Sequence, residues 1–162
     1  SINWTKDNLK FNDLDKIFQW QENYILKDIY FAHANPFEYG DWSYLETEEK
    51  IFKATKYLNE HDFLCGVFGH SHRQYIMSAA QKLSNPFQSN LDNLYEPLIV
   101  NVGTIGQPRG KGFCYSLIQI DDKKIQVELI EFQPSIDKII DHINLSTMSE
   151  RTKLQLAEYL RK

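Results

Sequence analysis

The sequence predicts an α/β fold in a single domain that covers all 162 residues. Apolar runs of strand length alternate with segments of helical periodicity along the whole chain. Three of the apolar runs end in loops that carry histidine or clustered glycine. Because ligands of α/β folds bind beyond the carboxyl ends of strands, these loops predict one shared site.

The first half of the chain is expected to contain short strands and one well-defined helix. The polar opening, residues 1–12, is long enough for a short helix, and residues 14–20 form a weak helical segment. Residues 47–60 form the clearest helix, because apolar side chains recur at helical spacing behind a glutamate-rich first turn. Three apolar stretches bounded by turn residues are expected to be strands: residues 24–26, 29–32 and 63–68.

The second half is expected to be richer in strands and to end in helices. Residues 84–96 are rich in Asn, Ser and Pro, which predicts a loop. The sequence Asp121-Asp122-Lys123-Lys124 separates two apolar runs and indicates a hairpin. The expected strands are residues 73–77, 98–102, 113–120 and 125–132. The expected helices are residues 135–143 and 149–160.

Composition limits the possible functions. Apolar residues make up 42% of the chain and charged residues 25%, as in ordinary globular domains. A net charge of -4 argues against a broad nucleic-acid-binding face but allows a small phosphorylated substrate, since a bound metal pair would reverse the local charge. No apolar run approaches the roughly 18 residues of a membrane helix, and the start lacks a signal-peptide pattern. Cys65 and Cys114 are expected to be buried free thiols in a cytoplasmic protein.

The histidines at the strand ends are the candidate metal ligands. His70 and His72 follow a buried strand, and residues two apart in extended chain project to the same side. His33 follows the strand at residues 29–32. Imidazole binds Zn, Fe, Ni and Cu, and added carboxylates would extend this set to Mn. The alternatives are an exposed turn with two incidental histidines, and a structural cap at His33. His61 and His142 belong to helical segments and are not assigned to the site.

The loop of residues 101–110 is a candidate anion site. Its glycines would let backbone N–H groups approach an anion, and Arg109 could contact a phosphate through two hydrogen bonds. The alternative is a structural turn in which Arg109 forms a salt bridge. The substrate-binding residues that we expect are Arg109, Asn35 and Gly103.

Three segments, in this order, resemble the calcineurin-like metallophosphoesterase superfamily. They are His33-Ala34-Asn35-Pro36, Gly69-His70-Ser71-His72 and Asn101-Val102-Gly103-Thr104-Ile105-Gly106-Gln107-Pro108-Arg109. The opening, with Trp4-Thr5 and Leu9, is similar to the stretch after the family's Gly-Asn-His-Asp motif. The chain looks like the carboxy-terminal half of a small bacterial or archaeal phosphodiesterase of the type related in fold to the retromer subunit.

The resemblance implies a fold and a chemistry. The fold would be a β-sandwich flanked by helices. His33 and His70 would bind the second of two divalent metals (Mn, Zn, Fe or Ni), and His72 the first. The metals, roughly 3.5–4 Å apart, would activate a hydroxide for attack on a phosphoester, most naturally a phosphodiester. The phosphorylated substrate would be small, and its identity would depend on residues 37–44 and 84–96.

The departures from the family pattern are also informative. The family's Asp-x-His, Gly-Asp and Gly-Asn-His-Asp/Glu motifs do not occur in this sequence, so the acidic ligands and the catalytic histidine are missing. We therefore expect this chain alone to be inactive, and to pair with the missing amino-terminal half or with itself through exposed strand edges. The alternatives are a protein-binding scaffold of the same fold and a zinc protein with a single three-histidine site.

Overall fold

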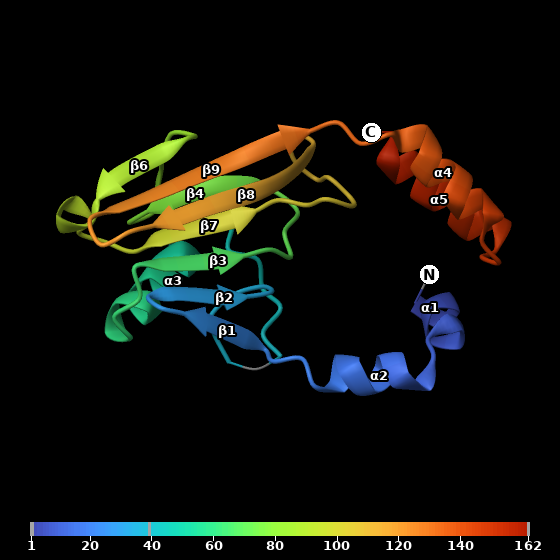
Figure 1. Ribbon diagram of the computed structural model, residues 1–162, viewed down its shortest axis with the longest axis horizontal. Coiled ribbons are helices and arrows are strands. Elements are labelled where there is room, and N and C mark those ends of the chain that lie inside the picture. The colour runs from blue at the N-terminus through green and yellow to red at the C-terminus, as the bar shows by residue number, and fades with distance from the viewer. Residues whose placement is uncertain (1, 39, 162) are drawn as a thin grey trace. The chain divides into compact units, whose positions relative to one another are not determined.

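The computed structural model describes residues 2–38 and 40–161, whose contacts group into two compact units. One unit is Glu22–Gln133, and the other combines Ser1–Gln21 with Pro134–Lys162 (Figure 1). Each unit is described by itself below. That all 162 residues form a single domain stays a prediction.

The larger unit is built on a six-stranded sheet with the order β1-β2-β3-β7-β4-β5. Its three neighbouring strands β2, β3 and β7 run parallel, and β1, β4 and β5 are antiparallel to their neighbours. Each parallel strand is a short apolar run, as expected for strands that are covered on both faces. The bounds are β1 Asn23–Leu26, β2 Ile29–Ala32, β3 Cys65–Phe68, β4 Gln74–Ser78, β5 Gln81–Lys82 and β7 Leu98–Val102.

A second, three-stranded antiparallel sheet covers one face of the first. Its order is β6-β9-β8, with β6 at Phe87–Asn90, β8 at Phe113–Ile120 and β9 at Lys124–Phe132. Side chains of both sheets share one buried core, whose members are Ile29, Cys65, Val67, Ile76, Leu98, Val100, Cys114, Ile125, Val127 and Leu129. The predicted α/β fold with a β-sandwich and a flanking helix is confirmed.

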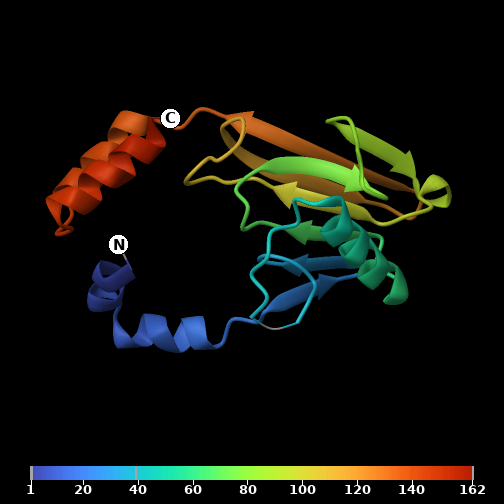
Figure 2. The ribbon, with the colours of Figure 1, turned by 180° about the vertical axis from the view of Figure 1, so that it is seen from behind.

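Helix α3, Glu48–Glu60, covers the other face of the six-stranded sheet (Figure 2). The helix begins where the Thr47 hydroxyl accepts a hydrogen bond from the Lys50 N–H, at 3.4 Å. Its buried face packs against Tyr30, Phe68 and Ile99 of the sheet. The strand beneath it needs glycine at position 66, because a Cβ atom there would lie 2.6 Å from a ring carbon of Phe68.

The predicted loop at residues 84–96 is only partly a loop. It contains β6 and the short 3-10 helix η1 at Leu91–Asn93. The polar sequence of β6 hides the strand, which exists because its backbone pairs with β9 from Phe87 opposite Val127 to Asn90 opposite Lys124. Tertiary pairing overrides local propensity here.

The smaller unit is helical. Its helices are α1 Ile2–Asn8, α2 Phe11–Phe18, α4 Ile136–Leu145 and α5 Glu150–Leu160. Within it, the Trp4 indole N–H donates a hydrogen bond of 2.9 Å to the Thr147 hydroxyl, which joins the two ends of the chain. Over residues 2–38 and 40–161, no helix combines the length and the apolar character that a membrane crossing requires.

Candidate functional site

The carboxyl ends of β2, β3 and β7 lie side by side. Ala32, Phe68 and Asn101 are in register across the three parallel strands, so the loops that follow them leave the sheet at one edge. The Gly69 N–H donates a 2.8 Å hydrogen bond to the carbonyl of His33, which joins two of these loops directly. The sequence predicted this convergence.

The three predicted histidines line one open pocket of about 450 Å³. Nε2 of His33 and Nδ1 of His70 are 3.1 Å apart, and the ring centroids are separated by 5.0 Å. His72 places Nδ1 2.7 Å from the carbonyl oxygen of Gln107. Because a carbonyl only accepts hydrogen bonds, Nδ1 of His72 carries a proton, and in a neutral ring Nε2 then keeps a lone pair for a ligand.

The backbone of the histidine loop is held in an unusual conformation. His70 and His72 have φ values of 59° and 60°, in the left-handed region that residues other than glycine rarely adopt. Buried Asn101 helps to hold it, since the Asn101 amide donates to the Gly69 carbonyl at 2.9 Å and its Oδ1 accepts from the Gly103 N–H at 3.4 Å. Strained backbone of this kind concentrates at functional sites.

Electrostatics favour a neutral ring at His33. Burial lowers the pKa of His33 below its usual value, and the neighbouring His70 and His72 rings lower this pKa further. A neutral imidazole has the lone pair that a metal ion requires.

The donor set fits part of a metal site. The 3.1 Å between His33 and His70 is a hydrogen-bond distance between the two rings. It is also close to the separation of about 3.3 Å between two imidazole nitrogens bound tetrahedrally to one Zn²⁺ at roughly 2.0–2.1 Å. The hydrogen bond from His72 to a backbone carbonyl is the kind that orients metal-binding histidines. Across the described ranges 2–38 and 40–161, no three or more His, Cys, Asp or Glu side chains are grouped closely enough to hold an ion. Metal binding by His33, His70 and His72 therefore stays a prediction.

The three predicted substrate-binding residues differ in their surroundings. Gly103 lines the histidine pocket, with a φ of 77°, and a Cβ atom added there would lie 3.2 Å from the Cβ of Cys114. Arg109 is exposed, and its Nη1 donates a 2.9 Å hydrogen bond to the hydroxyl of Tyr44. Asn35 is buried, and its side chain makes three hydrogen bonds within its own loop. It organises that loop, and its contact with a substrate stays a prediction.

Two aromatic residues beside the histidines were not singled out from the sequence. The Tyr44 ring lies over His70 with centroids 4.8 Å apart and planes inclined by 33°. The Trp42 ring centroid lies 5.7 Å from that of His33 and 5.8 Å from that of His70. The available signal was their position in the loop directly after the His33 motif.

His61 lies outside the histidine pocket, as predicted. It caps the carboxyl end of α3, where its Nδ1 lies 2.8 Å from the Tyr57 carbonyl, and its ring stacks on Tyr57. His142 lies in α4, as expected for a helical residue.

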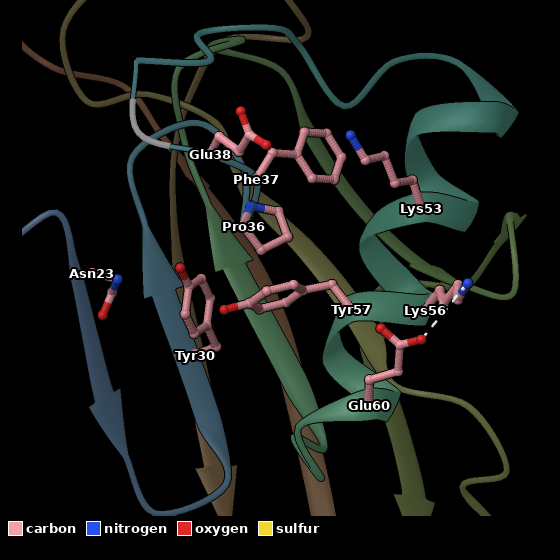
Figure 3. Close-up of a pocket in the computed structure, with 9 residues that line it drawn as sticks. All are labelled: Asn23, Tyr30, Pro36, Phe37, Glu38, Lys53, Lys56, Tyr57 and Glu60. Atoms are coloured by element: carbon pink, nitrogen blue, oxygen red, sulfur yellow. Dashed lines mark ion pairs between the residues drawn. The ribbon is translucent and has the colours of Figure 1, made fainter.

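A second pocket, of about 460 Å³, lies between α3 and the strands β1 and β2 (Figure 3). Lys53 lies 4.2 Å from the centre of the Phe37 ring, and Lys56 pairs with Glu60 at 3.7 Å. The full lining is Asn23, Tyr30, Pro36, Phe37, Glu38, Lys53, Lys56, Tyr57 and Glu60. The lining holds two lysines and two glutamates, so it offers no excess charge to select an ion. The histidine pocket is the stronger candidate for chemistry.

Comparisons with known proteins place the fold. No protein-family model matches the chain. An uncharacterized protein of Methanocaldococcus jannaschii is 29% identical over 161 residues, which cover 93% of this chain and 61% of that protein. A metallophosphoesterase from Sphaerobacter thermophilus superposes with a TM-score of 0.70 at 17% sequence identity, over 96% of this chain and 66% of that one. The chain therefore spans less than two thirds of the length of either protein.

Proposed function

Since the chain has a metallophosphoesterase fold, we propose that it is part of a metal-dependent hydrolase of phosphoesters, with phosphodiesters as the preferred class. The observation that carries this proposal is the meeting of His33 and His70, 3.1 Å apart, at the tips of two parallel strands. His72 lines the same pocket with a free Nε2. Two imidazoles that meet at strand ends, with a third in the lining of the same pocket, support an enzyme rather than a scaffold.

Each residue has a proposed role. His33 and His70 hold one divalent metal, His72 holds a second, and the ions are drawn from Mn, Zn, Fe and Ni. When bound, such a pair supplies charge stabilisation and an activated hydroxide. Arg109 binds a phosphate oxygen, because its single hydrogen bond to Tyr44 leaves other guanidinium N–H groups free to donate.

We further propose that the remaining, acidic ligands come from protein outside these 162 residues. Two exposed edge strands support the proposal that another polypeptide binds to this chain. In β1, Tyr24, Ile25 and Leu26 are each half exposed, and edge strand β8 exposes Tyr115 and Leu117. Exposed apolar edges invite strand pairing, so an amino-terminal half or a second copy would add there. A purified chain that sediments as a monomer at all concentrations would contradict this partner proposal. A cytoplasmic location stays a prediction.

The hydrolase proposal is tested by the activity of the complete protein on an aryl phosphodiester with added Mn²⁺. His72→Gln should lower kcat/KM about 100-fold, because the imidazole that is proposed to hold one metal is lost. His61→Gln is the matched control, since His61 lies at the end of α3 outside the pocket, and it should retain activity. Wild-type protein without hydrolysis, or equal losses in both variants, would refute the proposal. A single bound metal would instead support the mononuclear zinc alternative, and no metal the scaffold.

A further inference from the structure

The Trp42 side chain is an exposed aromatic surface beside the rings of His33 and His70. Its side chain is 59% exposed, although its ring lies within 6 Å, centre to centre, of both His33 and His70. Tyr44 differs, because its ring already lies over His70 and its hydroxyl accepts from Arg109. Trp42 therefore presents the open aromatic face of this loop.

The backbone around Trp42 is fixed by hydrogen bonds on both sides. The buried Asn35 amide donates to the carbonyl of Asp41 at 2.8 Å and to that of Ser43 at 2.9 Å. The Asp41 carboxylate accepts from the Ser43 N–H at 2.8 Å, and its hydrogen bonds to Ser43 hold the pKa of Asp41 below its usual value. A loop whose backbone is already held by hydrogen bonds loses little conformational entropy when a ligand binds. The exposed indole of Trp42 is therefore preorganised for ligand binding.

The neighbouring groups indicate which ligand would stack there. The imidazoles and the Arg109 guanidinium suit a phosphate, and the indole suits a flat ring attached to it. A free apolar ligand would leave the cationic and imidazole groups unused. A phosphate without a ring would leave Trp42 uncovered.

We propose that Trp42 is a stacking platform for the planar aromatic part of a phosphate ester, so that the substrate class is nucleotide-like. This inference rests on the proposed phosphoesterase function, because it assigns the phosphate to His33 and His70, the histidines beside Trp42. Trp42 positions the substrate and takes no part in proton transfer.

The test is calorimetric binding of AMP, adenosine, ribose 5-phosphate and inorganic phosphate to the purified protein with Mn²⁺ present. Wild type should bind AMP about 10-fold or more tighter than ribose 5-phosphate, which is the scale of one base stacked on an aromatic side chain. Trp42→Leu should remove this preference and leave phosphate binding unchanged, whereas Trp42→Phe should restore part of it. Tyr95→Leu is the matched control, because Tyr95 is 86% exposed and precedes β7, at the strand end opposite the pocket.

The outcomes separate the two proposals. Equal affinities of wild type for AMP and ribose 5-phosphate, or an AMP preference that survives in Trp42→Leu, would overturn the stacking platform and leave the phosphoesterase proposal standing. Adenosine binding that depends on Trp42, in a protein that binds no phosphate and hydrolyses no ester, would support the platform and refute the phosphoesterase. Loss of the preference in Tyr95→Leu would also overturn the platform.

Discussion

Asn101→Ala should loosen the histidine site and destabilise the larger unit together. Asn101 is 1% exposed and is the next-to-last residue of strand β7, which lies between β3 and β4. Its amide donates to the Gly69 carbonyl, immediately before His70, and its Oδ1 accepts from Gly103. The substitution removes both hydrogen bonds and leaves the two backbone groups without this partner.

The cost can be worked out from these contacts. Two net hydrogen bonds contribute about 1 kcal/mol each, and the buried Gly103 N–H left unpaired adds roughly 1–3 kcal/mol. The Gly69 carbonyl keeps its 2.6 Å hydrogen bond from the Ser71 N–H. We expect a loss of about 3 kcal/mol in the free energy of unfolding, or roughly 10 °C in Tm for a unit of this size. The same change should weaken metal binding, because the peptide that carries His70 loses its link to β7.

Urea unfolding followed by circular dichroism measures this loss at 25 °C. Asn90→Ala is the control, because Asn90 is an exposed residue of edge strand β6, and it should change stability by less than about 0.5 kcal/mol. If Asn101→Ala cost less than about 1 kcal/mol, Asn101 would not be the link between the strand-end loops.

Three further predictions follow from the packing and the site. Gly66→Ala should lower the free energy of unfolding by about 1–3 kcal/mol through overpacking, since its Cβ would lie 2.6 Å from the Phe68 ring. A variant that is more stable than wild type in urea unfolding would contradict the packing of α3. Burial raises the pKa of the Cys65 thiol to about 12. At pH 9, iodoacetamide should therefore alkylate Cys65 far more slowly in the folded protein than in the urea-unfolded protein. Equal alkylation rates, measured by mass spectrometry, would show that the core around Cys65 is open. Tyr44→Phe removes the hydroxyl that accepts a hydrogen bond from Arg109. It should weaken phosphate binding a few-fold in calorimetry, while the Tm changes little. An unchanged phosphate affinity would show that this contact does not position Arg109.

Much of the fold was accessible from the sequence because apolar patterning decides it. The strands β2, β7 and β8 match the predicted residues, and each begins in a run of buried apolar side chains. Strand β6 was missed because its residues, FQSN, contain a single apolar side chain and its existence depends on pairing with β9. A long-range backbone ladder of this kind leaves no local signal.

The parts of the site that lie at the ends of strands could be predicted from the sequence. His33, His70 and Gly103 follow strands that became parallel neighbours, so their meeting follows from topology. Trp42 could not be placed in the same way, because its position depends on Asn35, whose hydrogen bonds bridge residues six and eight positions away. Asn35 was expected to face substrate, yet its polar atoms are engaged by its own loop.

The most direct measurement of the central claim is the metal content of the purified protein, determined by elemental analysis after dialysis against Mn²⁺ or Zn²⁺. We predict that the wild-type protein retains metal, and that a His33→Ala/His70→Ala double variant folds but loses the metal. Equal metal content in the two proteins, or none in either, would contradict the assignment of these imidazoles as ligands.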